Sequence, residues 1–198
     1  MTAILPTPRA RRVRTLVGRT LLPTAVAITS ACSAAAPATS TSVPARPVPS
    51  ASGTTTPVAA STAARDRIAA TSDEVVGRTN AERRANGLPS LTRSVNLMSA
   101  ARLQAEQMAS ARDMSHDLPK AAYPTLKSRL GAVSYLWRAI AENIAEGQSG
   151  AAAVVASWMS STGHRANILS PAYTETGVGL AYSRDGRPYF AQVFARPR

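Results

Sequence analysis

The stretch GVGLAYSRDGRPYFAQVF, residues 177–194, contains two runs of strand-forming residues on either side of the sequence SRDGR. Apolar and aromatic residues recur at about every second position in these runs, which is the spacing of a strand with one buried face. Asp185-Gly186 is a preferred pair for the tip of a tight β-hairpin. The segment is therefore predicted to form an antiparallel hairpin.

The sequence ahead of the hairpin has helical periodicity. Apolar residues recur at near-helical spacing from Asp66 onward, and Asn86-Gly87 is a typical helix end. A second helix is expected after Thr92 or Ser94 as the N-cap residue. Its buried face is indicated by apolar residues at steps of three and four: Leu97, Met98, Ala101, Ala105, Met108 and Ala109.

Two shorter helices are expected further along the chain. One covers residues 125–130, with Pro124 near its first turn. The other begins after Ser149, where three apolar residues share a face: Val154, Val155 and Trp158. Helices followed by a hairpin predict an α+β fold, in one domain over residues 66–198.

The first 32 residues have the composition of an export signal. Five arginines and no acidic residue precede an uncharged, mostly apolar run, TLLPTAVAITSA, at residues 20–31. As a helix, this run would be about 18 Å long, whereas the hydrocarbon core of a bilayer is about 30 Å thick. We therefore predict a signal peptide over residues 1–32 rather than a membrane-spanning helix.

The signal ends in TSAC, residues 29–32, which resembles a bacterial lipobox. The cysteine of a lipobox is diacylated and becomes the first residue of the mature protein, and Cys32 is the only cysteine of the chain. Lipidation of Cys32 would hold an exported lipoprotein at the outer face of the cytoplasmic membrane or in the cell wall. Thr29 stands where leucine is commonest, so cleavage at an ordinary small-residue site, which gives a secreted protein, is the alternative.

Residues 33–65 have too few apolar side chains to build a core. They are rich in Pro, Ala, Ser and Thr, and they contain no aromatic residue, Leu, Ile or Met. Such a composition predicts a disordered tether. Its end-to-end distance would be about 30 Å as a flexible coil and could approach roughly 100 Å in an extended form.

The formal net charge of +12 does not point to nucleic acid. Five of the positive charges belong to the signal, and the rest are spread over the chain, with Arg83-Arg84 as the only adjacent basic pair after residue 32. A nucleic-acid reader usually has a basic stripe or a recognisable module, and neither is present. The charge suits the anionic surface of a cell envelope instead.

Three residues could carry chemistry: His116 in DMSHD, Glu142 in AENIAEG and His164 in STGHRANIL. All three lie near the ends of predicted elements or in loops, where functional residues are often placed. Two imidazoles and a carboxylate are a suitable ligand set for Zn²⁺, with a fourth position left for water. No HExxH or similar motif forces two ligands onto one helical face, so structural roles for both histidines are the alternative.

Five motifs together resemble the CAP superfamily (cysteine-rich secretory proteins, antigen 5 and pathogenesis-related proteins), in its short bacterial branch. They follow one another over nearly the whole predicted domain: TNAERRANGLPSL, AARLQAEQMAS with MSH, AENIAEG, SWMSSTGHRANIL and TGVGLAYSRDGRPYFAQVF. The resemblance implies a three-layer α-β-α sandwich, in which helices cover both faces of a small antiparallel sheet.

The resemblance also implies a cleft with two His and two Glu that can bind a divalent cation, zinc being the expected ion here. By motif, three of these residues fall on His116, Glu142 and His164. The fourth, a glutamate, falls at Ser161, so a ligand or a residue that orients the imidazoles is missing. Water, Glu146 or Glu175 could replace it. The disulfides of the family are absent, because no cysteine follows residue 32.

STGHRANIL is expected to turn the chain out of the helix that contains Trp158 and to aim His164 into this cleft. Gly163 would supply backbone freedom, and Arg165 and Asn167 would secure the loop by hydrogen bonds.

The sequence favours a non-enzymatic, envelope-anchored binding module whose His/Glu cleft holds an envelope component, a lipid or a protein. The alternative is a metal-dependent extracellular hydrolase or peptidase, in which Glu142 acts as base on a metal-bound water. A purely structural spacer is the third reading. Fold alone does not decide among them.

Overall fold

The computed structural model of the protein describes the backbone of residues 57–198 and the side chains of residues 61–198. The predicted signal peptide, Cys32 and the greater part of the tether lie outside the described residues. The first helix, α1 (Pro57–Ala85), includes residues 57–65, which the sequence analysis places in the tether. Proline is favoured in the first turn of a helix and alanine has the highest helix propensity, so the sequence PVAASTAAR suits this start.

The other helices are shorter. They are α2 (Val95–Ala111), α3 (Leu126–Ala132), α4 (Ala151–Ser160) and α5 (Thr162–Ile168). Ser94 is the residue before α2, as predicted, and Thr125 caps α3 through reciprocal hydrogen bonds with Ser128. No helix of the described residues combines the length and the apolar character needed to cross a membrane.

Four strands form one sheet in the order β1-β3-β4-β2. The strands are β1 (Thr92–Arg93), β2 (Trp137–Glu146), β3 (Glu175–Tyr182) and β4 (Pro188–Pro197). β3 and β4 form the predicted hairpin, and Gly186 at its tip has a φ of 80°, which glycine adopts without strain. The sheet is antiparallel except for the two-residue pairing of β1 with β3.

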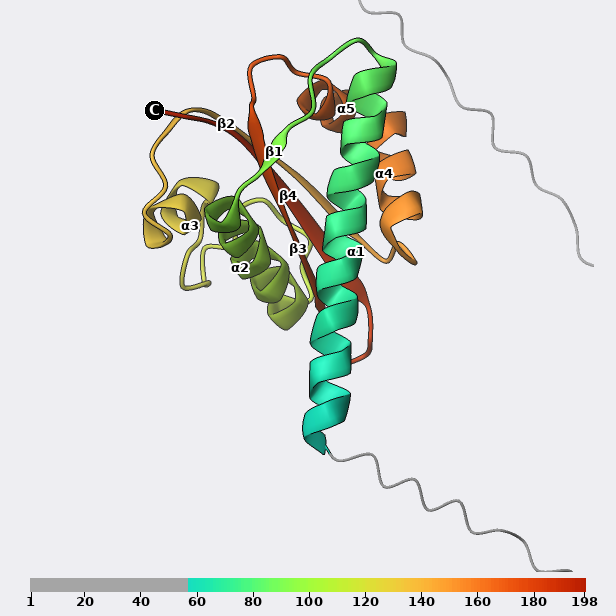
Figure 1. The fold of residues 1–198 in the computed structure, drawn as a ribbon. Coiled ribbons are helices and arrows are strands. Elements are labelled where there is room, and N and C mark those ends of the chain that lie inside the picture. The colour runs from blue at the N-terminus through green and yellow to red at the C-terminus, as the bar shows by residue number, and fades with distance from the viewer. Residues whose placement is uncertain (1–56) are drawn as a thin grey trace, which may run out of the picture. The chain divides into compact units, whose positions relative to one another are not determined.

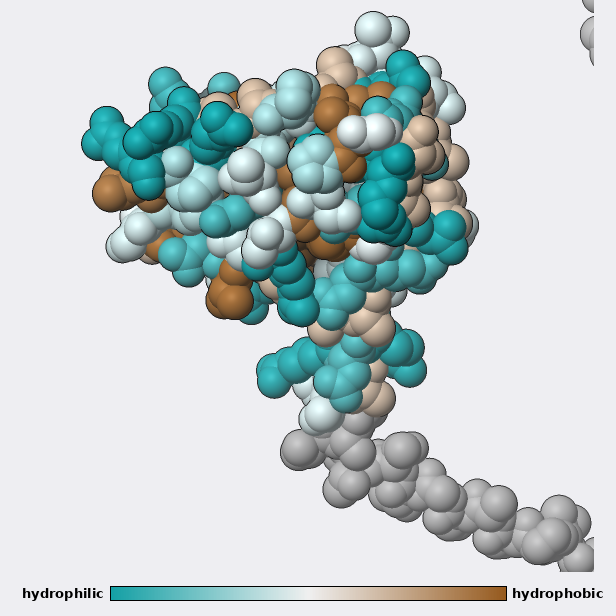
Figure 2. Space-filling model, turned by 45° about the horizontal axis from the view of Figure 1, so that its top comes forward, coloured by the Kyte–Doolittle hydropathy of each residue, from teal (hydrophilic) through white to brown (hydrophobic). Residues whose placement is uncertain are grey.

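The predicted α-β-α sandwich is confirmed. Figure 1 shows α2 and α3 on one side of the sheet and α1, α4 and α5 on the other. Each face has its own apolar cluster, one around Leu97, Met108 and Tyr189 and the other around Val75, Trp158 and Phe190. The first turns of α1 project beyond the rest of this domain (Figures 1 and 2).

Two glycines of the opening motif allow helix α2 to touch the sheet directly. A Cβ atom at Gly177 would overlap the backbone of Leu97 and Met98, and one at Gly179 would overlap the backbone of Ala101. No flexible side chain could give way at these contacts, because the neighbouring atoms belong to the helix backbone. The GVG sequence therefore fixes how closely α2 packs on β3.

Two parts of the site have more regular structure than the sequence predicted. Residues 137–146, for which the sequence predicted no strand, form the edge strand β2, and STGHRANIL contains helix α5 rather than a simple turn. Gly163 lies inside α5, so it supplies none of the unusual backbone freedom expected of it. Ser161 is the single residue between α4 and α5.

Candidate functional site

A buried ion pair forms the base of the site. Arg129 of α3 donates a hydrogen bond from Nη2 to Oε2 of Glu142 on β2 over 2.8 Å. The two side chains are only 0% and 3% exposed. Two charges removed from water in this way hold each other in one geometry, since either alone would be costly to bury.

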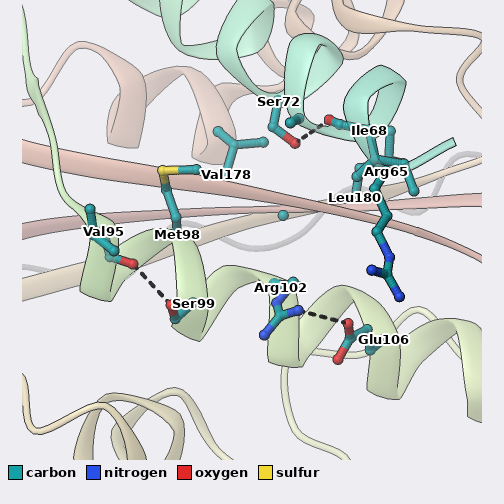
Figure 3. A pocket seen from close by; sticks show the side chains of 12 residues that line it. Arg65, Ile68, Ser72, Val95, Met98, Ser99, Arg102, Glu106, Val178 and Leu180 are labelled. Atoms are coloured by element: carbon teal, nitrogen blue, oxygen red, sulfur yellow. Dashed lines mark hydrogen bonds and ion pairs between the residues drawn. The ribbon is translucent and has the colours of Figure 1, made fainter. Parts of the chain in front are cut away.

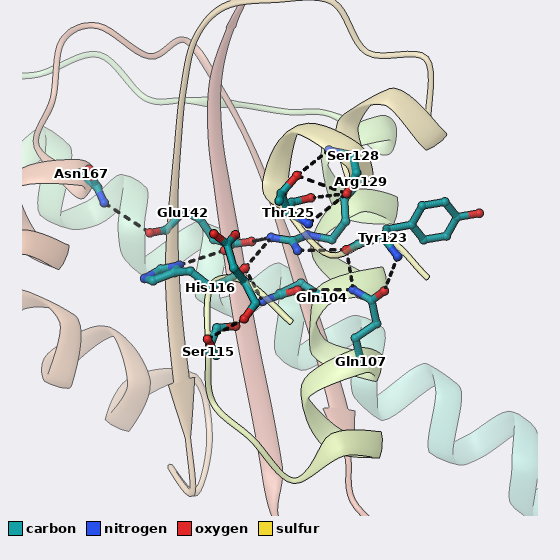
Figure 4. Close-up of polar contacts among 11 residues, drawn as sticks. Gln104, Gln107, Ser115, His116, Tyr123, Thr125, Ser128, Arg129, Glu142 and Asn167 are labelled. Carbon is teal, nitrogen blue, oxygen red and sulfur yellow. Dashed lines mark hydrogen bonds and ion pairs between the residues drawn. The ribbon is translucent and has the colours of Figure 1, made fainter. Parts of the chain in front are cut away.

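The second oxygen of the same carboxylate holds a histidine. Oε1 of Glu142 lies 3.0 Å from Nδ1 of His116, whose side chain is 55% exposed. Because a carboxylate only accepts hydrogen bonds, Nδ1 carries the proton, and Nε2 of the neutral ring is left as an acceptor. Figure 4 shows the Glu142 carboxylate between the Arg129 guanidinium and the His116 ring.

The backbone of the loop that carries His116 is also fixed. Gln104 of α2 is fully buried and donates from Nε2 to the carbonyls of Ser115 (2.6 Å) and His116 (3.2 Å). The ring and the backbone of His116 are thus held by two different elements. A half-exposed side chain with both ends fixed is prepared for contact with a ligand.

The neighbouring residue of β2 holds the second histidine segment. The side chain of Asn143 is buried and donates to the carbonyl of His164 over 3.1 Å. Asn167 of α5 in turn donates to Oδ1 of Asn143 (2.9 Å) and to the carbonyl of Glu142 (3.4 Å). Asn167 therefore secures this segment, as predicted, while the side chain of Arg165 is exposed.

Arg83 ties α5 to α1. Its buried guanidinium donates from Nη1 to the carbonyls of Ile168 and Ser170, each over 2.8 Å, and from Nε to the carbonyl of Pro89 over 2.9 Å. The carbonyl of Ile168 lies in the last turn of α5 and that of Ser170 just beyond it, where a helix end leaves carbonyls without partners in the helix. Arg83 thereby holds the end of the helix that carries His164.

The two imidazoles have opposite pKa shifts. The hydrogen bond to Glu142 raises the pKa of His116 above its usual value, against the opposing effect of partial burial. Burial lowers the pKa of His164, and the positive charge of His116 lowers it further. The two rings are therefore near enough for the charge of one to affect the other, and protonation of His116 disfavours protonation of His164.

Each oxygen of Glu142 accepts a hydrogen bond and its side chain is only 3% exposed, so coordination of a metal ion by Glu142 stays a prediction. Among the described residues, no group of three or more His, Cys, Asp or Glu side chains is placed to hold a metal ion. The carboxylate instead has the position of a group that orients a histidine. Zinc binding by the two imidazoles stays a prediction.

Neither of the suggested replacements for the missing glutamate serves the histidines. Oε1 of Glu146 pairs with Arg187 over 3.1 Å, and Oε2 of Glu175 accepts a hydrogen bond from the hydroxyl of Tyr135 over 2.9 Å. Position 161, where the resemblance places a glutamate, has a serine that makes no side-chain capping bond to α5.

Known proteins with similar sequences identify the family of this chain. Residues 76–194 match the model of the cysteine-rich secretory protein (CAP) family. The chain belongs to this family. The match begins within α1, ends at Phe194 within β4, and covers all the elements between them.

Two proteins similar to this CAP protein come from Bacillus species. The chain is 37% identical over 123 residues to the "Uncharacterized protein YkwD" of Bacillus subtilis (strain 168), over 62% of this chain and 47% of that one. A solved extracellular protein containing an SCP domain from Bacillus anthracis str. Ames is 28% identical, with a TM-score of 0.62 over 73% of this chain and 45% of that one. The chain thus spans about half the length of both relatives.

A more distant solved structure shares the fold. An outer surface protein of Borrelia burgdorferi is 18% identical and has a TM-score of 0.59, over 65% of this chain and 93% of that protein. At this identity the likeness concerns the CAP fold alone.

Three residues that support the CAP site were not singled out from the sequence. Arg129, Gln104 and Asn143 are polar but fully buried. A signal does exist for two of them, because Arg129 shares a helix face with Leu126 and Leu130, and Gln104 follows Leu97 and Ala101 on the buried face of α2. A polar residue on an apolar helix face indicates a partner inside the fold.

Proposed function

We propose that this protein is an exported CAP domain that binds a component of the bacterial cell envelope at a surface formed by His116 and His164, without altering it chemically. Its similarity to an extracellular SCP-domain protein supports export. The positively charged chain suits the anionic polymers and lipids of an envelope.

The observation that carries this proposal is the fixed, half-exposed ring of His116. Its partners Glu142 and Arg129 are almost completely buried, whereas 55% of its own side chain is exposed. A ring held in this way presents a hydrogen-bonding edge to a ligand without losing further side-chain entropy. Nε2 of the neutral ring matches a hydroxyl donor, whereas the protonated ring, which the raised pKa of His116 favours, matches a carboxylate or phosphate.

A hydrolase would need a free base to activate water. Glu142 was the candidate, but its two oxygens are engaged by His116 and Arg129. The nearby hydroxyl of Ser115 donates to the carbonyl of Asp117 over 2.8 Å rather than to an imidazole. Because neither Glu142 nor Ser115 is free to act on a substrate, we favour binding over hydrolysis.

Sedimentation with isolated envelopes of the source bacterium tests the proposal. The probe protein is the full chain with Cys32→Ser, so that a lipid anchor does not contribute. We expect His116→Gln/His164→Gln to lower the bound fraction at least tenfold, with Arg84→Gln on the exposed surface as the matched control. Equal sedimentation of the double variant and the control would refute the proposed surface.

Zinc is tested separately by calorimetric titration of the same protein at pH 7.5 and pH 5.5. A two-imidazole site should bind at pH 7.5, weaken at pH 5.5 because the rings must be neutral to coordinate, and disappear in the double variant. Heat that is unchanged in the double variant would place the metal elsewhere. If envelope binding persists in the presence of a chelator, the envelope component binds without the metal ion.

We further propose that Cys32 is lipidated and holds the domain at the outer face of the cytoplasmic membrane. Cys32→Ser should move the protein from the membrane fraction to the medium, and labelling with a radioactive fatty acid should be lost. Equal release of both forms would favour cleavage at an ordinary signal-peptidase site.

A further inference from the structure

The edge of β3 has an unpaired stretch. Its partner β1 has only two residues, which pair with Glu175 and Thr176, and no other strand of the described residues lies on this side of β3. The carbonyl of Thr176 accepts a hydrogen bond from the N–H of Ser94 on this side. Because alternate residues of a strand point their backbone groups the same way, the N–H and C=O groups of Val178 and Leu180 face this edge too.

A groove runs along the unpaired stretch, between α1 and α2. Its volume is about 740 Å³, and its floor includes Val178, Gly179 and Leu180 of β3. Figure 3 shows α1 on one side of the strands and α2 on the other, with the side chains of Ile68 and Met98 turned toward the gap. This volume lies within the range of about 300–1,000 Å³ that is common for ligand sites.

The outward backbone groups at the floor of the groove lack hydrogen-bond partners among the described residues. Val178 and Leu180 are 2% and 3% exposed, and no hydrogen bond to their outward N–H and C=O groups is found among the described residues. Buried backbone groups without partners are rare and costly. Because these groups are almost fully covered, a ligand reaches them only when covering side chains such as Met98 move aside, and it then gains most if it offers donors and acceptors at strand spacing.

The rim of the groove is mainly positive. Arg65 extends from α1 toward α2, where Arg102 lies 3.8 Å from Glu106 (Figure 3). Two cations and one anion at this end match an acidic side chain on the ligand. At the other end of the groove Val95 is 75% exposed, which suits an apolar side chain on the ligand.

From these observations we propose that the groove binds an extended peptide segment of a partner protein, which adds to β3 as a parallel or antiparallel fifth strand. The peptide pairs with the backbone of Val178 and Leu180, and an acidic residue meets Arg65 and Arg102. Strand addition to a sheet edge is an established mode of peptide recognition. Met98, a flexible and partly exposed side chain, adjusts to the peptide.

Other occupants fit less well. An acyl chain would leave the backbone groups of Val178 and Leu180 without partners. A second copy of this sheet edge would bring its own flanking helices into collision with α1 and α2. The protein's own segment 33–56 contains Pro37, Pro44, Pro47 and Pro49, and proline cannot donate to a strand ladder.

This groove is independent of the proposed histidine surface. His116 and His164 are attached to β2, whereas the groove follows β3, and β4 lies between these two strands. A failure of peptide binding would leave the envelope-binding proposal unaffected, and the reverse also holds.

Selection of random twelve-residue peptides displayed on phage, with the full chain immobilised, tests the proposal. We expect enriched peptides with alternating β-branched residues and at least one acid. Ser99→Trp should fill the groove and reduce their affinity at least tenfold, as should Arg65→Glu/Arg102→Glu. Arg84→Glu/Arg138→Glu, at two exposed positions outside the groove, is the charge-matched control for the double variant. Val95→Trp, at an exposed position, provides a second blocking variant if Ser99→Trp does not fold.

The backbone contribution is tested with N-methylated forms of an enriched peptide. Methylation of alternate amides should abolish binding in one register and be tolerated in the other, because only one edge of the peptide faces β3. Equal binding of both forms would overturn strand addition. A library that yields no peptide sensitive to the blocking variants would overturn the site, as would binding of sodium myristate that excludes the peptides.

Discussion

Arg129 and Glu142 are joined by a 2.8 Å hydrogen bond at the junction of α3 and β2, and neither side chain is in contact with bulk water. The ion pair lies directly beneath His116, so it stabilises the domain and the site together. Removal of Arg129 leaves the buried carboxylate of Glu142 with the half-exposed His116 ring as its remaining side-chain partner.

Arg129→Met should therefore lower the free energy of unfolding by about 3–5 kcal/mol at pH 7, as measured by urea denaturation. The double variant Arg129→Met/Glu142→Leu should be more stable than Arg129→Met, because it has no unpaired charge. A loss below about 1 kcal/mol in the single variant would contradict the buried pair.

The two histidines should titrate on opposite sides of the usual value of about 6.5. Nuclear magnetic resonance should find the pKa of His116 above it, because of the hydrogen bond to Glu142, and the pKa of His164 below it, because of burial. His116→Gln should raise the pKa of His164, since it removes a nearby positive charge. An unchanged His164 titration would show that the rings do not interact.

Their effects on stability should also be opposite in sign. The contribution of His116 is fully present below the pKa of the unfolded chain and is lost as pH rises through its higher folded pKa. The contribution of His164 is present above the unfolded pKa and is lost as pH falls through its lower folded pKa. Unfolding curves of His116→Gln and His164→Gln between pH 4.5 and 8.5 should therefore differ from wild type in opposite pH ranges.

Gly179→Ala should be strongly destabilising, by about 3 kcal/mol or more, because the new methyl group overlaps the α2 backbone. Gly77→Ala is the matched control on α1, where the methyl group would have open space. It should stabilise the protein by up to about 1 kcal/mol through helix propensity. Thermal unfolding of both variants measures the contrast, and similar midpoints would refute the close approach.

Arg83→Met should loosen α5 while the sheet stays intact. The variant leaves the carbonyls of Ile168 and Ser170 without their charged donor, at a cost of about 3 kcal/mol. Hydrogen exchange should accelerate in residues 162–170 more than in β3 and β4. Uniform acceleration over the whole domain would mean that Arg83 supports the fold generally rather than α5.

The elements that the sequence predicted are those whose signals are local. The Asp185-Gly186 turn and the apolar face of α2 are each encoded within a few neighbouring residues, and both were placed correctly except for Met98, which is only partly buried. The resemblance to the CAP superfamily correctly predicted the three layers. It also named the three residues that the structure brings to β2 and its surroundings, namely His116, Glu142 and His164.

The parts that were missed depend on contacts between distant segments. β2 contains the polar pair Glu142-Asn143 in its middle, so it lacks the alternation of a strand with one apolar face. Both side chains are buried only because Arg129 and the backbone of His164 satisfy them. Helix α5 has seven residues with a glycine among them, and its stability comes from Arg83 and Asn143 rather than from propensity.

Glu142 and Asn143 are consecutive, and one holds the His116 ring while the other holds the His164 backbone from the opposite layer. The strand that bears them lies at the edge of the sheet and pairs with β4 alone. Separation of this one strand from its neighbour would disturb the hydrogen bonds to the His116 ring and to the His164 carbonyl in a single event. Local unfolding of β2 would therefore affect both histidines together. A ligand that contacts both would stabilise this edge of the sheet against unfolding.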